Sequence, residues 1–476
     1  MKVYLSTLGC KLNESELKSW ARRFADDGCE VVGDPRDADI CVLNTCTVTH
    51  TAARKSRQMA RQLARANPAT RIVLTGCFGD IAPDEAKALP NVALVVPNAD
   101  KDRLVEQVAA SSSKQQAGSP EGTEGSPASN LQLLASNFPF QTSNLQPPIS
   151  NLHSPNSRTR AFVKIQDGCN MSCTYCIIPL ARGRERSRSR EEIVAEVQSL
   201  VSAGYKEIIL TGVQISAYSN LAKVEDPAFL SGVANLRKDS LRDLVAAILA
   251  ETAVPRLRLT SIAPWDLDES LLDLWRDPRL CRHLHLSLQS GSDTVLRRMR
   301  RPYTTAQFAR AAEQARGKIP GVGITTDVIV GFPGESAVEF EQSLRFVEQM
   351  QFSRAHVFPY SARAGTVAAT LPLPVADAVK SARRAQMQAT ADASARAFAA
   401  QFVGQTMPVL WETVNSGKWI VDSDSPLTTH YSPLVWSGYT DNYIRVLAAS
   451  DTNLYNQISP ACVRNIEEDG VIADLV

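Results

Sequence analysis

The chain has 476 residues, of which 44% are hydrophobic, and its formal net charge is +1. The length allows about three domains, and the near-zero charge excludes a globally basic surface, so any nucleic-acid footprint must be local. Ten cysteines are too few for a disulfide scaffold of this length and indicate metal binding in a reducing compartment. The first residues are strand-like and no apolar run reaches about 18 residues, so we expect a cytoplasmic protein without signal peptide or membrane span.

Strands and helices alternate over residues 1–110, which predicts an open parallel sheet with helices on both faces. Three cysteines, Cys10, Cys46 and Cys77, each follow a predicted strand, with a small residue before each of them. The carboxyl ends of parallel strands form the ligand crevice of such a sheet. A single cysteine there is usually a core residue, but three in the same placement predict a shared iron–sulfur cluster.

Residues 111–158 are dominated by Ser, Gln, Asn, Pro and Gly, with little charge and no helical or strand period. This composition is typical of a chain that cannot bury a core. We therefore expect a flexible linker between two domains.

Strand–helix units recur over residues 159–400. The expected strands are Ala161–Ile165, Glu207–Thr211, Arg256–Ser261, Leu284–Leu288, Ile324–Val330 and Arg354–Tyr360. Six such units predict a partial (βα)6 barrel. Barrels of this kind carry their chemistry at the carboxyl ends of the strands, and polar or glycine-rich segments follow the strands here.

The loop after the first barrel strand holds Cys169, Cys173 and Cys176 in a Cys-x-x-x-Cys-x-x-Cys spacing. Cysteine thiolate is the standard ligand of iron–sulfur clusters, and a two-cluster ferredoxin would show a different spacing. A structural zinc ion would require four protein ligands. The loop therefore predicts a cubane cluster with one iron open to a small molecule, and a zinc site or a reduced cysteine cluster is the alternative.

A small β domain is expected at residues 405–476, with strands at Met407–Trp411, Tyr439–Val446 and Val463–Ile466. Nine acidic side chains against three basic ones make this segment poorly suited to grip phosphates by charge. Its aromatic side chains could stack on bases or could equally form the core.

Basic residues cluster locally in three places. The helix expected at Thr51–Ala66 is basic, and two arginine groups follow presumed cofactor elements. These groups are Arg182, Arg184, Arg186, Arg188 and Arg190, and Arg297, Arg298, Arg300 and Arg301. A charge run is usually just a solvated face, yet three basic groups around one predicted site are consistent with a rim that binds RNA phosphates.

The Cys169 loop, with Tyr175 before its last cysteine, resembles the signature of the radical S-adenosylmethionine enzymes. Three further segments resemble the cluster-binding motifs of the methylthiotransferases within that group: Thr7-Leu8-Gly9-Cys10-Lys11-Leu12-Asn13, Leu43-Asn44-Thr45-Cys46-Thr47-Val48-Thr49 and Leu74-Thr75-Gly76-Cys77. The second of these is most similar to the branch that acts on threonylcarbamoyladenosine in tRNA. The C-terminal segment resembles the small RNA-binding barrel called a TRAM domain.

The resemblance implies two 4Fe-4S clusters, on Cys169, Cys173 and Cys176 and on Cys10, Cys46 and Cys77, with S-adenosylmethionine as radical source and methyl donor. It also implies contacts to S-adenosylmethionine from Tyr175, Gly212, Ser261, Gln289, Ile329 and Gly331. No side chain is assigned a catalytic role. At Ala263, where many relatives carry a carboxylate, this chain has none.

The implied reaction adds a methylthio group to carbon 2 of N6-threonylcarbamoyladenosine next to the anticodon. The implied partners are the tRNA anticodon loop and an electron donor such as flavodoxin or ferredoxin. Alternatives are a methylthiotransferase acting on isopentenyladenosine in tRNA or on a ribosomal protein, and a radical enzyme whose second cluster only relays electrons. A non-catalytic iron–sulfur sensor or RNA-binding protein is the alternative from another class.

Overall fold

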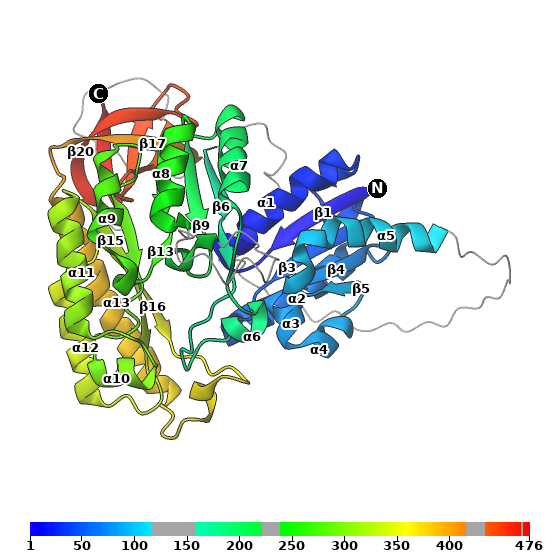
Figure 1. The fold of residues 1–476 in the computed structure, drawn as a ribbon, viewed down its shortest axis with the longest axis horizontal. Helices are drawn as coiled ribbons and strands as arrows, with labels where there is room; N and C mark the ends of the chain where they lie inside the picture. The colour runs from blue at the N-terminus through cyan, green and yellow to red at the C-terminus, as the bar shows by residue number, and fades with distance from the viewer. Residues whose placement is uncertain (117–158, 221–238, 416–433, 468–469) are drawn as a thin grey trace, which may run out of the picture. The chain divides into compact units, whose positions relative to one another are not determined.

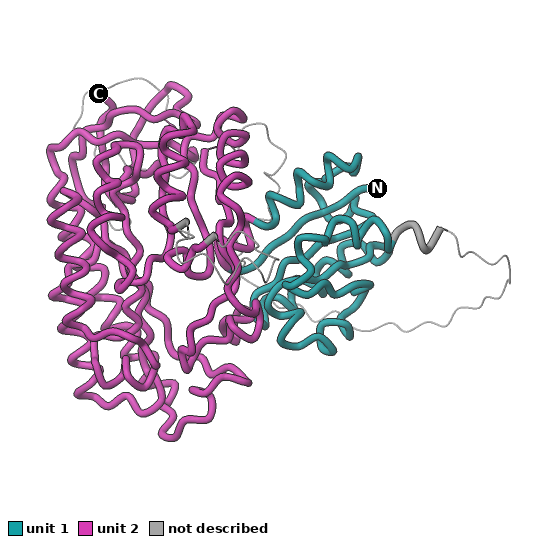
Figure 2. The backbone as a smooth tube through the Cα atoms, in the orientation of Figure 1, with its two compact units in different colours: residues 1–9, 16–46, 53–154 teal, residues 10–15, 47–52, 155–476 magenta. Residues whose placement is uncertain are grey.

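The computed structural model describes residues 1–116, 159–220, 239–415, 434–467 and 470–476, so most of the expected linker lies outside the described residues. The chain divides into two compact units (Figure 2). Unit 1 comprises residues 1–9, 16–46 and 53–154, and unit 2 comprises residues 10–15, 47–52 and 155–476. Two short segments of the N-terminal region, 10–15 and 47–52, thus belong to the larger unit.

Unit 1 contains the predicted open parallel sheet (Figure 1). Its strand order is β2-β1-β3-β4-β5 and every neighbouring pair is parallel. The strands are β1 (Lys2–Thr7), β2 (Glu30–Val32), β3 (Ile40–Thr45), β4 (Arg71–Gly76) and β5 (Val92–Val96). All six residues of β3 are buried, as expected of a central strand covered on both faces.

Helices cover both faces of this sheet. They are α1 (Lys11–Asp26), α2 (His50–Ala66), α3 (Cys77–Ile81), α4 (Pro83–Lys87) and α5 (Leu104–Gln116). Side chains of α1 and α5 share one buried apolar cluster, and side chains of α2, α3 and α4 share another. Helix α5 continues past residue 110, where we had expected the linker to begin.

The central part of unit 2 is the predicted partial barrel of parallel strands. Two sheets, β12-β9-β6 and β13-β14-β15-β16, follow the chain order. The strands are β6 (Arg160–Lys164), β9 (Glu207–Thr211), β12 (Arg256–Leu259), β13 (Ser261–Ile262), β14 (His283–Leu286), β15 (Gly323–Val330) and β16 (Arg354–Pro359). The third predicted strand is divided at Thr260 into β12 and β13.

Helices connect these strands as expected of strand–helix units. They are α6 (Ile178–Arg182), α7 (Arg190–Ser202), α8 (Leu241–Glu251), α9 (Glu269–Leu272), α10 (Asp293–Arg298), α11 (Thr305–Lys318), α12 (Ala337–Met350) and α13 (Asp377–Ala400). Helices α8, α11 and α12 each begin with a capping box, which satisfies free N–H groups of the first turn. Short ladders pair β7 (Gln166–Asp167) with β8 (Arg186–Ser187), and β10 (Ser219–Asn220) with β11 (Asp239–Ser240).

The C-terminal segment forms a closed five-stranded barrel, in the order β17-β18-β19-β21-β20. Its strands are β17 (Thr406–Asn415), β18 (Leu434–Thr440), β19 (Arg445–Ser450), β20 (Ile458–Glu467) and β21 (Gly470–Leu475). The single strand expected at Tyr439–Val446 is wrong, because the chain turns between β18 and β19 and Tyr443 takes a φ of +72°. Trp411 and Trp436 are buried in the barrel core, which settles their role as packing residues.

This barrel docks on the amino-terminal end of β12. The Arg256 guanidinium donates to the backbone carbonyls of Pro408 (2.7 Å) and Tyr439 (3.1 Å), and Arg258 donates to that of Asp441 (3.0 Å). The carboxyl ends of the central strands, where chemistry is expected, remain uncovered by these contacts. Among the described helices, none has the length and apolar character needed to cross a membrane.

Candidate functional site

The loop that carries Cys169, Cys173 and Cys176 begins at Gly168, just after β7. Gly168 has a φ of +69°, and a Cβ atom there would lie 2.0 Å from the carbonyl oxygen of Arg184. Only glycine fits this combination of conformation and close approach. The three cysteines are half-buried and unbridged, so their thiols are accessible for ligation.

Burial and the Arg301 guanidinium have opposite effects on the pKa values of the cysteines in this loop. Burial raises the pKa of the Cys176 thiol to about 12 and also raises the pKa of the Cys169 thiol. The Arg301 guanidinium donates a hydrogen bond to the Cys173 sulfur at 3.2 Å. Iron binding must therefore displace protons from these half-buried thiols. The positive charge of Arg301 favours the thiolate form. This donor set fits an iron–sulfur cluster.

Gln166 ties the cysteine loop to the end of the second barrel strand. Its Nε2 donates to the Gly168 carbonyl at 2.8 Å, and its Oε1 accepts from the backbone N–H groups of Val213 and Gln214, both at 3.0 Å. The Gln214 Oε1 in turn lies 3.5 Å from the Cys169 sulfur. Sequence reasoning missed both glutamines, because an isolated glutamine carries no motif.

The residues predicted to contact S-adenosylmethionine lie in the cysteine loop or at carboxyl ends of barrel strands. They are Tyr175 in the loop, Gly212 after β9, Ser261 in β13, Gln289 after β14, and Ile329 and Gly331 at the end of β15. A Cβ atom at Gly212 would lie 2.9 Å from the Gln166 carbonyl oxygen, so the glycine permits close backbone packing.

The structure brings some of these predicted contacts together. Tyr175 and Ile329 pack against one apolar cluster, made of Val295, Met299, Phe332 and Ala368. The Ile329 N–H donates to the Gln289 carbonyl at 2.8 Å, and Gln289 takes a φ of +67°. Ser261 instead pairs with His285 of the neighbouring strand β14. The Gly331 N–H donates to the Glu335 carboxylate at 2.7 Å, which orders the turn after β15.

Cys46 and Cys77 leave neighbouring strands of unit 1 at the same level, because Thr45 pairs with Gly76. Gly76 has a φ of +93°, and a Cβ atom there would lie 2.4 Å from the Thr45 carbonyl oxygen. Both cysteines are buried. Cys10 differs, because it is exposed, belongs to unit 2, and is separated from β1 by two residues rather than following it directly.

A buried ion pair supports the segment that leads to Cys46. The Lys101 ammonium lies 2.6 Å from the Glu16 carboxylate and donates to Asn44 Oδ1 at 3.0 Å, with both charged side chains 2% exposed. Asn44 also donates to Glu16 at 2.9 Å.

In the described part of the chain, no three His, Cys, Asp or Glu side chains are arranged to hold a single metal ion.

The expectation that both arginine groups form a phosphate-binding rim is wrong for several members. Arg182 is buried, Arg188 pairs with Glu196 at 2.7 Å, and Arg298 pairs with Glu339 at 2.9 Å. Arg301 faces Cys173. The exposed members are Arg184, Arg186, Arg297 and Arg300.

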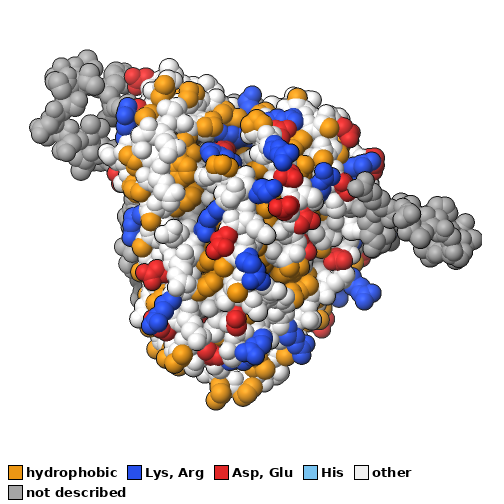
Figure 3. Space-filling view, turned by 60° about the vertical axis from the view of Figure 1, so that its left-hand side comes forward, with side chains coloured by type: hydrophobic (Ala, Val, Ile, Leu, Met, Phe, Trp, Pro, Cys, Tyr) orange, Lys and Arg blue, Asp and Glu red, His pale blue; other side chains and the backbone are white. Residues whose placement is uncertain are grey.

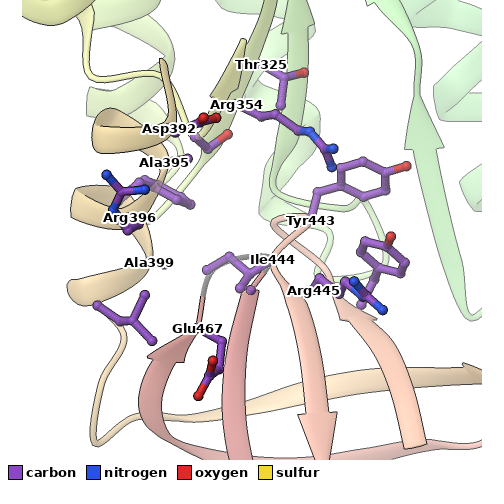
Figure 4. Close-up of a pocket in the computed structure, with 15 residues that line it drawn as sticks. Thr325, Arg354, Asp392, Ala395, Arg396, Ala399, Tyr443, Ile444, Arg445 and Glu467 are labelled. Atoms are coloured by element: carbon purple, nitrogen blue, oxygen red, sulfur yellow. The ribbon is translucent and has the colours of Figure 1, made fainter. Parts of the chain in front are cut away.

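A cavity of about 130 Å³ lies at the amino-terminal ends of β15 and β16, between α13 and the C-terminal barrel. Arg354, Arg396 and Arg445 line it together with Tyr439 and Tyr443, and Arg354 extends toward the Tyr443 ring (Figure 4). None of the predicted cluster or cofactor residues lines this cavity, which lies at the other end of the strands.

Comparison with known proteins adds to this geometry. Residues 163–347 match the radical SAM superfamily, and residues 2–97 match a family described as uncharacterized protein family UPF0004. The chain is 34% identical to the threonylcarbamoyladenosine tRNA methylthiotransferase MtaB of Bacillus subtilis, across 96% of this chain and 92% of that protein. The protein of the same name from Thermotoga maritima is 33% identical, across 100% and 98%. This chain belongs to the radical SAM methylthiotransferase family.

The methylthiotransferase is also similar to the tRNA-2-methylthio-N(6)-dimethylallyladenosine synthase of Xanthomonas campestris, at 32% identity across 86% of this chain and 81% of that protein. Among solved structures, the radical S-adenosylmethionine methyltransferase TsrM of Kitasatospora setae matches with a TM-score of 0.51 at 17% identity, covering 75% of this chain and 72% of that chain. That likeness supports the fold. Membership of the radical SAM superfamily implies S-adenosylmethionine and one 4Fe-4S cluster as cofactors.

Proposed function

We propose that this methylthiotransferase adds a methylthio group to carbon 2 of N6-threonylcarbamoyladenosine, next to the anticodon of a tRNA. The observation that carries the proposal is the similarity to proteins named for that reaction, at 34% and 33% identity over almost the whole chain. Similarity to the dimethylallyladenosine synthase covers less of both chains. The segment Asn44-Thr45-Cys46-Thr47-Val48-Thr49 supports the same branch.

Two cysteine sets would hold two clusters in this proposal. Cys169, Cys173 and Cys176 would bind the cluster that engages S-adenosylmethionine, and Cys10, Cys46 and Cys77 would bind a second one. When bound, S-adenosylmethionine and its cluster supply a radical able to remove hydrogen from an unactivated carbon, and a second molecule supplies a methyl group.

The chain's own residues would bind and orient these groups. Tyr175 and Ile329 would offer an apolar wall, Gly212 and Gly331 would let backbone approach the cofactor, and Gln289 would present its polar side chain at the end of β14. Ser261 is proposed as a further contact. Arg301 and Gln166 hold the first cluster loop in shape through the Cys173 sulfur and the Gly168 carbonyl.

The proposed partners follow from this chemistry. The substrate is a tRNA whose modified adenine must be unstacked from the anticodon loop to reach the barrel. The first cluster needs a one-electron donor, for which flavodoxin or ferredoxin is suited. A tRNA substrate and thiolate-bound iron both favour the reducing cytoplasm as the place of action.

The test is mass spectrometry of nucleosides from tRNA treated anaerobically with reconstituted protein, S-adenosylmethionine, sulfide and a reductant. One tRNA should carry threonylcarbamoyladenosine and a parallel one isopentenyladenosine. We expect a methylthio mass gain on the first alone. Gain on the second alone would reassign the substrate, and deoxyadenosine formation without gain on either would favour a protein substrate or an electron-relay role.

A further inference from the structure

Arg182 joins the Cys169 loop to residues 10–15, which contain Cys10 and the first residues of α1 and are called the Cys10 loop below. Its side chain is 1% exposed and donates in two directions. Nη1 donates to Asp167 Oδ1 at 2.9 Å, and Nη2 donates to Asn13 Oδ1 at 2.6 Å. The same Asn13 oxygen lies 3.8 Å from the Cys10 sulfur. Residues 10–15 and Arg182 belong to the same compact unit.

The Asp167 end of this link leads directly into the first cluster loop. Asp167 Oδ1 also accepts from the Gly168 N–H at 2.8 Å, immediately before Cys169. A guanidinium is planar and presents its donors in a fixed fork, so both acceptors are held in one geometry. Hydrogen bonds with a charged partner are roughly twice as strong as neutral ones, and this one is shielded from water.

A second buried arginine contacts the segment next to another cysteine of the second set. Arg363 Nη2 donates to Thr47 Oγ1 at 2.5 Å, and Thr47 directly follows Cys46. The His50 N–H donates to Ser361 Oγ at 3.2 Å close by. Residues 47–52 also belong to unit 2. Two cysteine-flanking segments are thus each bonded to the side chain of a buried arginine.

We infer that Arg182 is a positioning residue that fixes the Cys10 loop against the Cys169 loop, so that sulfur transfer is coupled to radical formation. The inference rests on the proposed function, and specifically on a second cluster held by Cys10. Radical formation needs only the Cys169 loop and S-adenosylmethionine. Sulfur insertion needs the Cys10 loop as well, and a misplacement of about 1 Å can lower a rate about 100-fold.

The decisive variant is Asn13→Ala, because it removes the Cys10 side of the link and leaves the Arg182–Asp167 pair in place. We expect methylthio product to fall at least about tenfold while 5′-deoxyadenosine formation stays within about twofold of wild type, since ΔΔG‡ of about 1.4 kcal/mol is a tenfold rate change. Asn13→Asp keeps an acceptor oxygen for Arg182, so we expect product within about threefold of wild type. Arg279→Met, which removes a partly buried arginine paired with Asp277, is the matched control and should change neither quantity.

A second measurement is independent of turnover. The magnetic interaction between the two reduced clusters, read from electron paramagnetic resonance spectra, should weaken in Asn13→Ala at unchanged iron content per chain. Arg182→Met should show the same change, and the double variant should be no worse than the more severe single variant, because both remove one link.

Several outcomes would overturn the inference. An equal fall of deoxyadenosine and product in Asn13→Ala would show a general folding role, and loss of iron would show a role in cluster binding. Unchanged product and an unchanged magnetic interaction would show no role. If wild-type protein makes no methylthio product on either tRNA, the proposed function fails, and the spectroscopic comparison still decides whether Asn13 positions the Cys10 loop.

Discussion

At the scale of single residues, Arg301 contacts a cysteine that is proposed to hold the first cluster. Its guanidinium donates to the Cys173 sulfur at 3.2 Å and stacks near the Trp265 and Tyr303 rings. Hydrogen bonds to cluster sulfurs and nearby positive charge make reduction easier. We expect Arg301→Gln to lower the midpoint potential by about 60 mV, a tenfold change for one electron.

The measurement for Arg301 is a potentiometric titration followed by electron paramagnetic resonance. It should use a background in which Cys10, Cys46 and Cys77 are replaced by alanine, so that only the Cys169 cluster contributes. Arg301→Lys keeps the charge and should lie between wild type and Arg301→Gln. A midpoint that is unchanged or higher in Arg301→Gln would contradict this role.

Glu207 carries a buried charge whose removal should be costly. Its carboxylate accepts hydrogen bonds from Arg258 Nε at 2.7 Å and from Arg258 Nη2 at 3.0 Å, and both side chains are 1% exposed. Breaking a buried pair leaves an uncompensated charge and costs about 3–5 kcal/mol. We therefore expect Glu207→Gln to lower the free energy of unfolding by that amount at pH 7, measured by urea denaturation.

The exposed pair of Glu341 and Arg345, at 2.9 Å, provides the control. Glu341→Gln should change the free energy of unfolding by less than about 1 kcal/mol, because solvent screens an exposed pair. Equal effects of the two substitutions would contradict the importance of burial.

The pH dependence of the Glu207 contribution follows from its pKa. Burial alone would raise this pKa, but the guanidinium groups of Arg258, Arg160 and Arg256 outweigh it and lower the pKa from 4.5 to about 2. A lowered pKa means that the stabilisation is fully present above about pH 4.5 and is lost as the pH falls toward 2. The stability difference between wild type and Glu207→Gln should therefore shrink across this window, and a difference that grows on acidification would be inconsistent with the ion pair.

At the scale of elements, two glycines lie in the segment that connects the antiparallel strands β7 and β8. Comparing their alanine variants distinguishes the effect of backbone strain from that of steric clash. Gly168 and Gly183 have φ values of +69° and +72°. An added Cβ at Gly168 would lie 2.0 Å from the Arg184 carbonyl oxygen, whereas one at Gly183 would meet nothing within 4 Å. Both alanine variants bear the strain of a positive φ, about 1–3 kcal/mol, but only Gly168→Ala must also displace the backbone of the cysteine loop.

We expect Gly168→Ala to lose most of the iron held by Cys169, Cys173 and Cys176, and Gly183→Ala to retain it. Iron and sulfide per chain, measured after anaerobic reconstitution, check this expectation. Equal iron loss in both variants would show that backbone conformation alone, rather than the close approach to Arg184, disturbs the loop.

The elements show how far sequence patterns reach. All six barrel strands and the N-terminal parallel sheet follow from local hydrophobic runs and from the residues that end them. The prediction of one strand at Tyr439–Val446 is wrong because the chain turns there with Tyr443 at a positive φ. The apolar pattern of this segment gives no indication of that turn. The division of the third barrel strand at Thr260 left no signal in the pattern either.

The site residues that sequence reasoning missed act through distant partners. Arg182 bonds Asn13 across 169 residues, and Arg301 bonds Cys173 across 128 residues. The sequence predicts both arginines as members of basic groups on a rim, because a run of charges shows composition and does not show which partners the side chains contact. The two cysteine sets stay a prediction, which rests on local properties: the spacing of one set and the position of the other after strands.

At the scale of the whole molecule, positive and negative side chains are interspersed over the face in Figure 3, in keeping with a net charge of +1. Affinity for the proposed tRNA substrate must therefore come from local groups. The outer face of α2 offers one, because Arg54, Arg61 and Arg65 are exposed while Ala53, Ala60 and Leu63 face the core.

We expect replacement of Arg54, Arg61 and Arg65 by glutamine to weaken tRNA binding and to reduce the slope of log affinity against log salt by up to about 2.7, since each phosphate contact contributes about 0.7–0.9. Filter binding or fluorescence anisotropy measures the affinity and its salt slope. The salt concentration should run from roughly 50 to 300 mM, where affinity changes steeply with salt. Three exposed arginines on outer helices of unit 2, Arg310, Arg345 and Arg384, form the matched control. Similar slopes for the two triple variants would exclude α2 as a specific tRNA contact and would leave non-specific charge as the source of affinity.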